Sequence, residues 1–177
     1  GWQSIRGVDD LLLYGRNIEI YAAETDIRRS LNVVGSARWS GSPATVMHHI
    51  ETISFNGEYG TEDGTVIRNQ LDLTTGFTSA ESVEWNSNAV LQLHGFNPQL
   101  TGSSVGSGAT LAVKNFSTWG TSDTPTMTVK LIGNSTLVLG GGAYARYAEQ
   151  GVDGVKRLKS LITDAAIQGQ AERATLV

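Results

Sequence analysis

Large aliphatic residues recur along this chain at intervals of twenty positions. One column steps from Leu11 to Leu131 and a second from Leu13 to Gly133, and within them only Glu51 and Gly133 are not large aliphatics. In the central units a polar or small residue separates the two columns, which gives the alternation of a strand with one buried face. We therefore expect each unit of about 20 residues to contribute a short strand to a shared stack.

The clearest copies of the unit are "NAVLQLHGF" at 88–96 and "GATLAVKNF" at 108–116. Aligning them places Leu91 over Leu111 and Phe96 over Phe116. We expect the two phenylalanines to stack inside the fold, with Phe77 close to the same column.

Turn residues separate the units, in stretches such as "FNGEYGTEDG" and "LTGSSVGSG", and the chain contains 21 glycines against 3 prolines. Regular units, alternating triplets and glycine-rich corners predict an all-β fold, a β-solenoid with coils of about 20 residues. An antiparallel β-sandwich or jelly roll with evenly spaced strands is the alternative. A third arrangement is an intertwined trimer in which three chains supply the faces of each layer.

The last part of the chain has a different pattern, which divides the sequence into a β-rich repeat domain at 1–150 and a tail at 151–177. Within the tail, apolar residues follow helical spacing between Asp153, a plausible N-cap, and Gly169, a plausible stop. The apolar positions are Val155, Leu158, Ile162 and Ala165. We expect a C-terminal capping α-helix that covers an exposed strand edge, or a short coiled-coil seam in an oligomer.

The composition of the chain limits the classes of function that it can have. The chain is 40% hydrophobic and 17% charged with a net charge of −4, which fits one packed domain and argues against a nucleic-acid partner. No apolar run approaches the length of a membrane span, so we expect no membrane insertion. Cysteine is absent, no cofactor motif occurs, and a strand would point His48 and His49 to opposite faces. We therefore expect neither a cofactor nor a metal site.

Carboxylates are the only candidate catalytic groups. The stretch "HHIETISFNGEYGTEDG" contains Glu51, Glu58 and Asp63, and a neighbouring unit could bring Asp72 beside them. Two carboxyl groups across a scissile bond suffice for glycoside hydrolysis. Glu51 stands out because it interrupts an aliphatic column, although a local bulge could turn it to solvent.

Aromatic residues beside turns favour binding over catalysis. Trp85 and Trp119 are the leading candidates, with Trp39 and Tyr59 in support, because a partly exposed ring can stack on the apolar face of a sugar. Their alternative role is packing beneath a loop or at a subunit contact.

Repeated β units rich in Gly, Ser, Thr and Asn, a cysteine-free composition and a helical end together resemble the distal part of bacteriophage tail fibres and tailspikes over residues 10–168. The resemblance implies an elongated homotrimer on a virion surface or in the extracellular space. It also implies attachment to cell-surface polysaccharide, which some members of this group cleave.

Three classes of function follow. We favour a structural and receptor-binding domain of a viral fibre. The second is a polysaccharide-degrading enzyme, either a glycoside hydrolase or a polysaccharide lyase, and the third is a non-viral carbohydrate-binding or adhesin module.

Overall fold

A computed structural model describes the chain at residues 4–40, 47–74, 76–94, 109–115, 118–119, 127–132, 135–139, 155–156, 158–163 and 175–176. All of the regular structure in these ranges is β-strand. The strands are β1 (Ser4–Tyr21), β2 (Glu24–Ser40), β3 (Met47–Phe55), β4 (Tyr59–Gly60), β5 (Val66–Ile67), β6 (Asn69–Leu73), β7 (Phe77–Trp85), β8 (Ala89–His94), β9 (Thr110–Asn115), β10 (Thr118–Trp119), β11 (Met127–Ile132), β12 (Thr136–Leu139), β13 (Val155–Lys156), β14 (Leu158–Thr163) and β15 (Thr175–Leu176).

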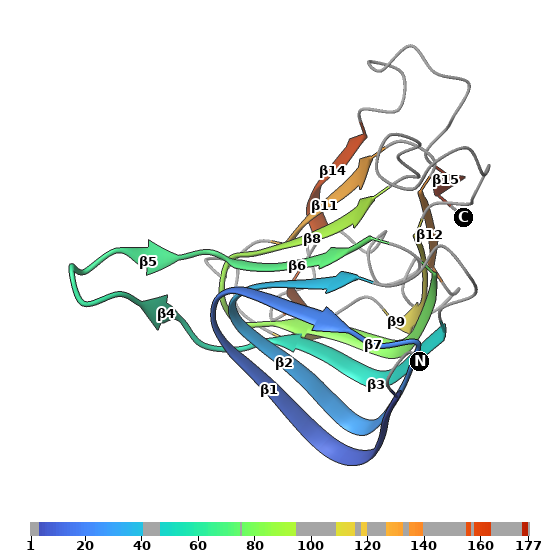
Figure 1. The fold of residues 1–177 in the computed structure, drawn as a ribbon. Coiled ribbons are helices and arrows are strands. Elements are labelled where there is room, and N and C mark those ends of the chain that lie inside the picture. Colours follow the sequence, from blue (N-terminus) through green and yellow to red (C-terminus); the bar gives the residue numbers. More distant parts are fainter. Residues whose placement is uncertain are drawn as a thin grey trace, which may run out of the picture.

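Eleven strands form one parallel sheet, which bends into a half-barrel (Figure 1). The long strands β1 and β2 run through the bend, and shorter strands extend the sheet on either side of it. We call residues 24–32 of β2 with β3, β7, β9, β12 and β15 the N arm. Residues 36–39 of β2 with β6, β8, β11 and β14 form the C arm. The strands β4 and β5 form a hairpin that projects from the bend, and β10 pairs with β13 in a second small sheet.

Glycine permits the bend in the two long strands. Gly15 of β1 pairs with Gly35 of β2, whose φ of 99° is in the region that side chains rarely adopt. A Cβ at position 35 would clash with the carbonyl oxygen of Gly15. Beside them, Asn17 has a φ of 58°, and its backbone N–H donates to Ser36 Oγ over 2.8 Å. The two arms can therefore share one core without a break in β1 or β2.

The core consists of aliphatic rows that cross the strands. In the N arm Leu31 pairs with Ile53, and Ile53 pairs with Val83. In the C arm Leu91 lies between Leu71 and Val129. All six side chains are fully buried and belong to one cluster that both arms enclose. At about 2 kcal/mol for each buried aliphatic side chain, these rows are the main source of stability.

The structure confirms an all-β chain but not the predicted architecture. Ser4 pairs with Glu24, Glu24 with Met47, Met47 with Phe77, and Phe77 with Thr110, so the spacing between neighbouring strands grows from 20 to 33 residues. The prediction of a β-solenoid with coils of about 20 residues is therefore wrong, because insertions between strands break the period. The alternative antiparallel sandwich or jelly roll is also wrong, since every pairing in the main sheet is parallel.

The predicted C-terminal capping α-helix is likewise contradicted. Where the structure describes the tail, residues 155–156 and 158–163 are strands, and β14 pairs in parallel with β11. A four-turn helix is marginal alone, whereas the edge of β11 offers a row of backbone hydrogen bonds. The other residues of the predicted helix, and both Phe96 and Phe116, lie outside the described residues. Within the described ranges, the structure contains no helix with the length and apolar character needed to cross a membrane.

Candidate functional site

A groove on the outer face of the N arm combines exposed apolar side chains with polar ones. Strand alternation builds it from two parallel rows. Glu24, Met47 and Phe77 are register partners in the first row, and Asp26, His49 and Ser79 in the second. Arg6 of β1 completes the lining. We call this set of seven residues the N-arm groove.

Two large apolar side chains of the N-arm groove face solvent. Met47 is 54% exposed and Phe77 is 41% exposed, and they are neighbours on adjacent strands. Isolated exposed apolar residues are common on protein surfaces, but an adjacent pair in a hollow is typical of a ligand-binding surface.

Polar groups flank this apolar pair. Arg6 forms an ion pair with Glu24, so their charges offset each other within the groove. His49 Nδ1 lies 3.1 Å from Ser79 Oγ. The Asp26 carboxylate is exposed and has no hydrogen-bond or ion-pair partner among the described residues. The groove therefore has one uncompensated negative charge and several groups that can exchange hydrogen bonds with a ligand.

The residues beneath the groove point into the core. Thr25 and His48 alternate with the groove residues and are buried, and the imidazole packs edge-on against Trp39 at a ring distance of 5.3 Å. Burial lowers the pKa of His48 from 6.5 to about 4. Neither Thr25 Oγ1 nor His48 Nδ1 has a hydrogen-bond partner among the described residues. The base of the groove is thus buried and electrically neutral at physiological pH.

The outer face of the C arm has a different character. Arg38, Asp72 and Gln92 occupy one register row, and only 9% of the Asp72 side chain is exposed. The Asp72 carboxylate lies 3.5 Å from Arg38 Nη2 and 3.7 Å from His94 Nε2, and it accepts a 2.8 Å hydrogen bond from Gln70. Burial raises the pKa of Asp72, but the contacts with His94, Gln70 and Arg38 together outweigh burial and leave the pKa lowered. Asp72 is therefore a paired carboxylate.

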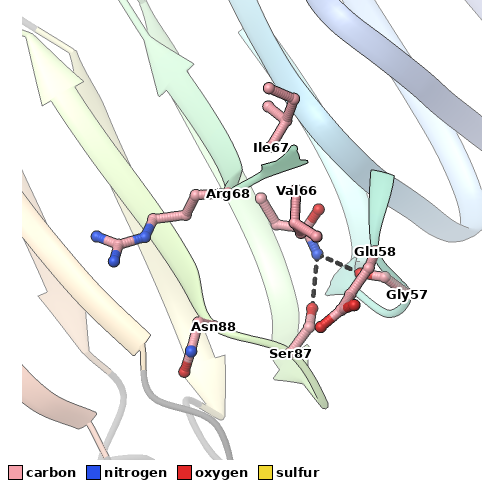
Figure 2. A pocket seen from close by; sticks show the side chains of 8 residues that line it. Gly57, Glu58, Val66, Ile67, Arg68, Ser87 and Asn88 are labelled. Atoms are coloured by element: carbon pink, nitrogen blue, oxygen red, sulfur yellow. Dashed lines mark hydrogen bonds between the residues drawn. The ribbon is translucent and has the colours of Figure 1, made fainter. Parts of the chain in front are cut away.

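A second hollow lies at the base of the β4–β5 hairpin (Figure 2). Asn69 donates hydrogen bonds to the Gly57 carbonyl oxygen and to Ser87 Oγ, and its own oxygen accepts from Gly35 N at 2.7 Å. Ser87 Oγ in turn donates to the Phe55 carbonyl oxygen. Figure 2 shows the Arg68 side chain extending away from Glu58 and Ser87. The polar groups at the centre of this hollow are already paired, so we assign them a role in holding the bend.

The aromatic residues predicted to bind sugar differ in their burial and in their surroundings. Trp39 and Trp85 are buried in the core, with no ring face open to a ligand. Tyr59 is half-buried and packs edge-on against Tyr14 at 5.0 Å. Trp119 lies in β10, opposite Val155, and its side chain is outside what the structure describes.

The predicted carboxylates are not brought together as a pair. Glu51 and Glu58 are exposed, while Asp63 lies in the hairpin turn, where hydrogen bonds from Thr61 and Thr65 lower its pKa to about 2. Asp72 is on the C arm. Glu51 leaves the aliphatic column because residues of β3 follow their partners in β2 by 22 or 23 positions instead of 20, which makes Ile53 the partner of Leu31.

Sequence reasoning missed the groove residues Asp26, Met47 and Phe77. Phe77 was expected inside the fold, yet it occupies an outer position in β7, where the buried Thr78 and Ala80 identify the inner face. In comparisons with known proteins, no family model, no curated protein and no solved structure matches this chain.

Proposed function

We propose that this chain is a carbohydrate-binding domain that holds a polysaccharide in the N-arm groove. The observation that supports the proposal is the exposed pair Met47 and Phe77 beside the polar row of Asp26, His49 and Ser79. A phenylalanine ring can stack on the apolar face of a sugar while the polar row binds its hydroxyl groups. Because the groove residues lie on four adjacent strands of one sheet, little ordering is needed on binding.

The charge of the groove indicates which classes of polysaccharide it would bind. Arg6 is paired with Glu24, which leaves Asp26 as the uncompensated charge. A carboxylate accepts hydrogen bonds from sugar hydroxyls or an amino group and repels another carboxylate. We therefore propose neutral or amino-sugar polysaccharides as the ligands and expect acidic ones to bind more weakly.

The carboxyl groups of the described residues support a binding function better than a catalytic one. Glycoside hydrolysis requires a carboxylic acid that stays protonated, which means a raised pKa. Among the described residues, the carboxyl groups with a shifted pKa are Asp10, Asp63 and Asp72, and all three are shifted downward. The narrower assignment to a viral fibre or tailspike, a location on a virion surface or outside the cell, and a homotrimeric state all stay predictions from sequence.

Affinity electrophoresis tests the binding proposal with three probes: dextran as a neutral polysaccharide, chitosan as an amino polysaccharide and alginate as an acidic one. We expect dextran or chitosan to retard the chain more than alginate. Phe77→Ala should weaken that binding roughly thirtyfold, the effect of losing about 2 kcal/mol at a central aromatic contact.

Val66→Ala is the matched control, because Val66 is also exposed but lies on the hairpin. It should bind as the unaltered chain does. Failure of all three probes to retard the chain, or equal binding by Phe77→Ala and Val66→Ala, would overturn the proposal.

A further inference from the structure

One edge of the strand β1 has no partner among the described strands. The strand pairs with β2 along nearly its whole length, and no other described strand pairs with it. Figure 1 shows β1 as the outermost strand of the half-barrel, following β2 around the bend. A free strand edge leaves a row of backbone N–H and C=O groups available for pairing.

The aliphatic rows of the core are only partly covered where they reach β1. Leu11, Ile18 and Ile20 pack against the core but stay half-exposed. Their partners in β2 are Leu31, Ala37 and Trp39, and all three of these are buried. One further strand beside β1 would complete the burial of these rows.

The outer face of β1 also carries exposed apolar side chains. Leu12, Tyr14 and Tyr21 are between 57 and 59% exposed, and they make up half of the exposed large hydrophobic side chains in the described residues. The acidic side chains of β1 are each engaged by another residue, and Glu19 accepts a 2.7 Å hydrogen bond from the Tyr21 hydroxyl. Asp9 lies 3.9 Å from Arg28 and Asp10 lies 2.6 Å from Arg29, so both are paired with residues of β2.

We propose that two copies of this chain associate through β1, which pairs in antiparallel orientation with β1 of the second copy across a two-fold axis at the bend. The proposal is independent of polysaccharide binding. A two-fold interface brings the same surface together twice, so the strand must be complementary to itself. The two-fold axis must also bring the bend of one β1 beside the bend of the other. This condition places the axis beside Gly15 and Arg16.

The side-chain pattern of β1 satisfies both conditions. With the axis between Gly15 and Arg16, Leu13 lies opposite Ile18 of the second copy, and Leu11 opposite Ile20, so inner residues face inner residues. On the outer face Leu12 lies opposite Glu19 of the second copy and diagonally beside its Tyr21, within reach of an aromatic side chain. The two exposed Arg16 side chains repel each other near the axis, so we expect added salt to tighten the dimer.

Light scattering after size-exclusion chromatography measures the association directly. We expect a mass of twice 18.9 kDa at concentrations of tens of micromolar. A monomer at that concentration would overturn the proposal. A trimer would also overturn it and would favour the homotrimer predicted from sequence.

Single cysteines test the position of the axis, because the chain has no cysteine of its own. Arg16 is exposed and next to the axis, so oxidised Arg16→Cys should form a disulfide-linked dimer on a non-reducing gel. Arg68→Cys, at an exposed site between β5 and β6, should stay largely uncrosslinked. Equal crosslinking of the two variants would contradict the proposed axis.

Opposite charges at Leu12 test the register. Leu12→Glu would face Glu19 of the second copy twice in each dimer, whereas Leu12→Lys would face it with the opposite charge. Because each dimer contains two of these cross-strand charge pairs, we expect Leu12→Glu to dissociate at least tenfold more readily than Leu12→Lys. Both variants change an exposed side chain, so the monomer should fold in either case. Equal dissociation would exclude this register.

Discussion

The N arm and the C arm have the same interior but different surfaces. Their inner rows contain fully buried aliphatic residues, represented by Leu31 and Ile53 in one arm and by Leu71 and Leu91 in the other. Their outer rows diverge, because the N arm exposes Met47 and Phe77 whereas the C arm presents the network around Asp72. Alternation along a strand allows this independence, since neighbouring side chains point to opposite faces. The inner rows therefore specify the fold and the outer rows can carry function.

Truncating one inner residue in each arm tests whether the interiors are equivalent and should give the largest effect. Ile53→Ala and Leu91→Ala each remove a fully buried side chain, and we expect each to lower the free energy of unfolding by about 2–5 kcal/mol. Chemical denaturation measures both values. The two interiors are not equivalent if one variant loses several kcal/mol of unfolding free energy while the other stays within about 0.5 kcal/mol of the unaltered chain. The smaller value is the range of an ordinary surface change.

Part of this interior could be predicted from sequence. The period of twenty correctly pairs Leu11 with Leu31 and Leu71 with Leu91. It fails for Leu111, whose partners are Thr78 and Leu137. The lengths of the insertions between strands decide which residues become neighbours, and hydrophobic alternation alone does not contain that information.

The groove was harder to predict than the core. Asp26, His49 and Ser79 are neighbours in space but belong to three strands, so no local motif connects them. The burial of two tryptophans, in contrast, has a signal in the sequence: Trp39 follows Ala37, and Trp85 follows Val83, at the strand period of two. Reading these positions as inner ones would have removed both from the ligand-binding candidates.

Acid should affect the two arms in different pH ranges, and His48 determines the range for the N arm. Its pKa is about 4 in the folded chain and 6.5 when solvated, so the unfolded chain binds more protons between these values. We expect stability to fall by up to roughly 3 kcal/mol as the pH drops from 6.5 to 4.

His48→Met should abolish the loss of stability between pH 6.5 and 4, because methionine fills the buried site without titrating. His49→Met is the control at the exposed neighbouring position and should keep the loss. Thermal unfolding at a series of pH values measures both. An unchanged pH profile in His48→Met would contradict the assignment of this pH range to the N arm.

Asp72 determines the acid response of the C arm, with a smaller effect. Because its folded pKa is below the usual 3.8, Asp72 contributes stability above that value, and the contribution disappears as the pH falls through the folded pKa. Asp72→Asn should cost about 1–2 kcal/mol at pH 7, since charge-assisted hydrogen bonds are replaced by neutral ones. The variant should also lose less stability than the unaltered chain below pH 4, while Glu51→Gln, at an exposed carboxylate of the N arm, should change neither quantity. If Asp72→Asn is as stable as Glu51→Gln at pH 7, the network with Arg38 and His94 does not stabilise the C arm, and its residues are then free to serve a ligand of their own.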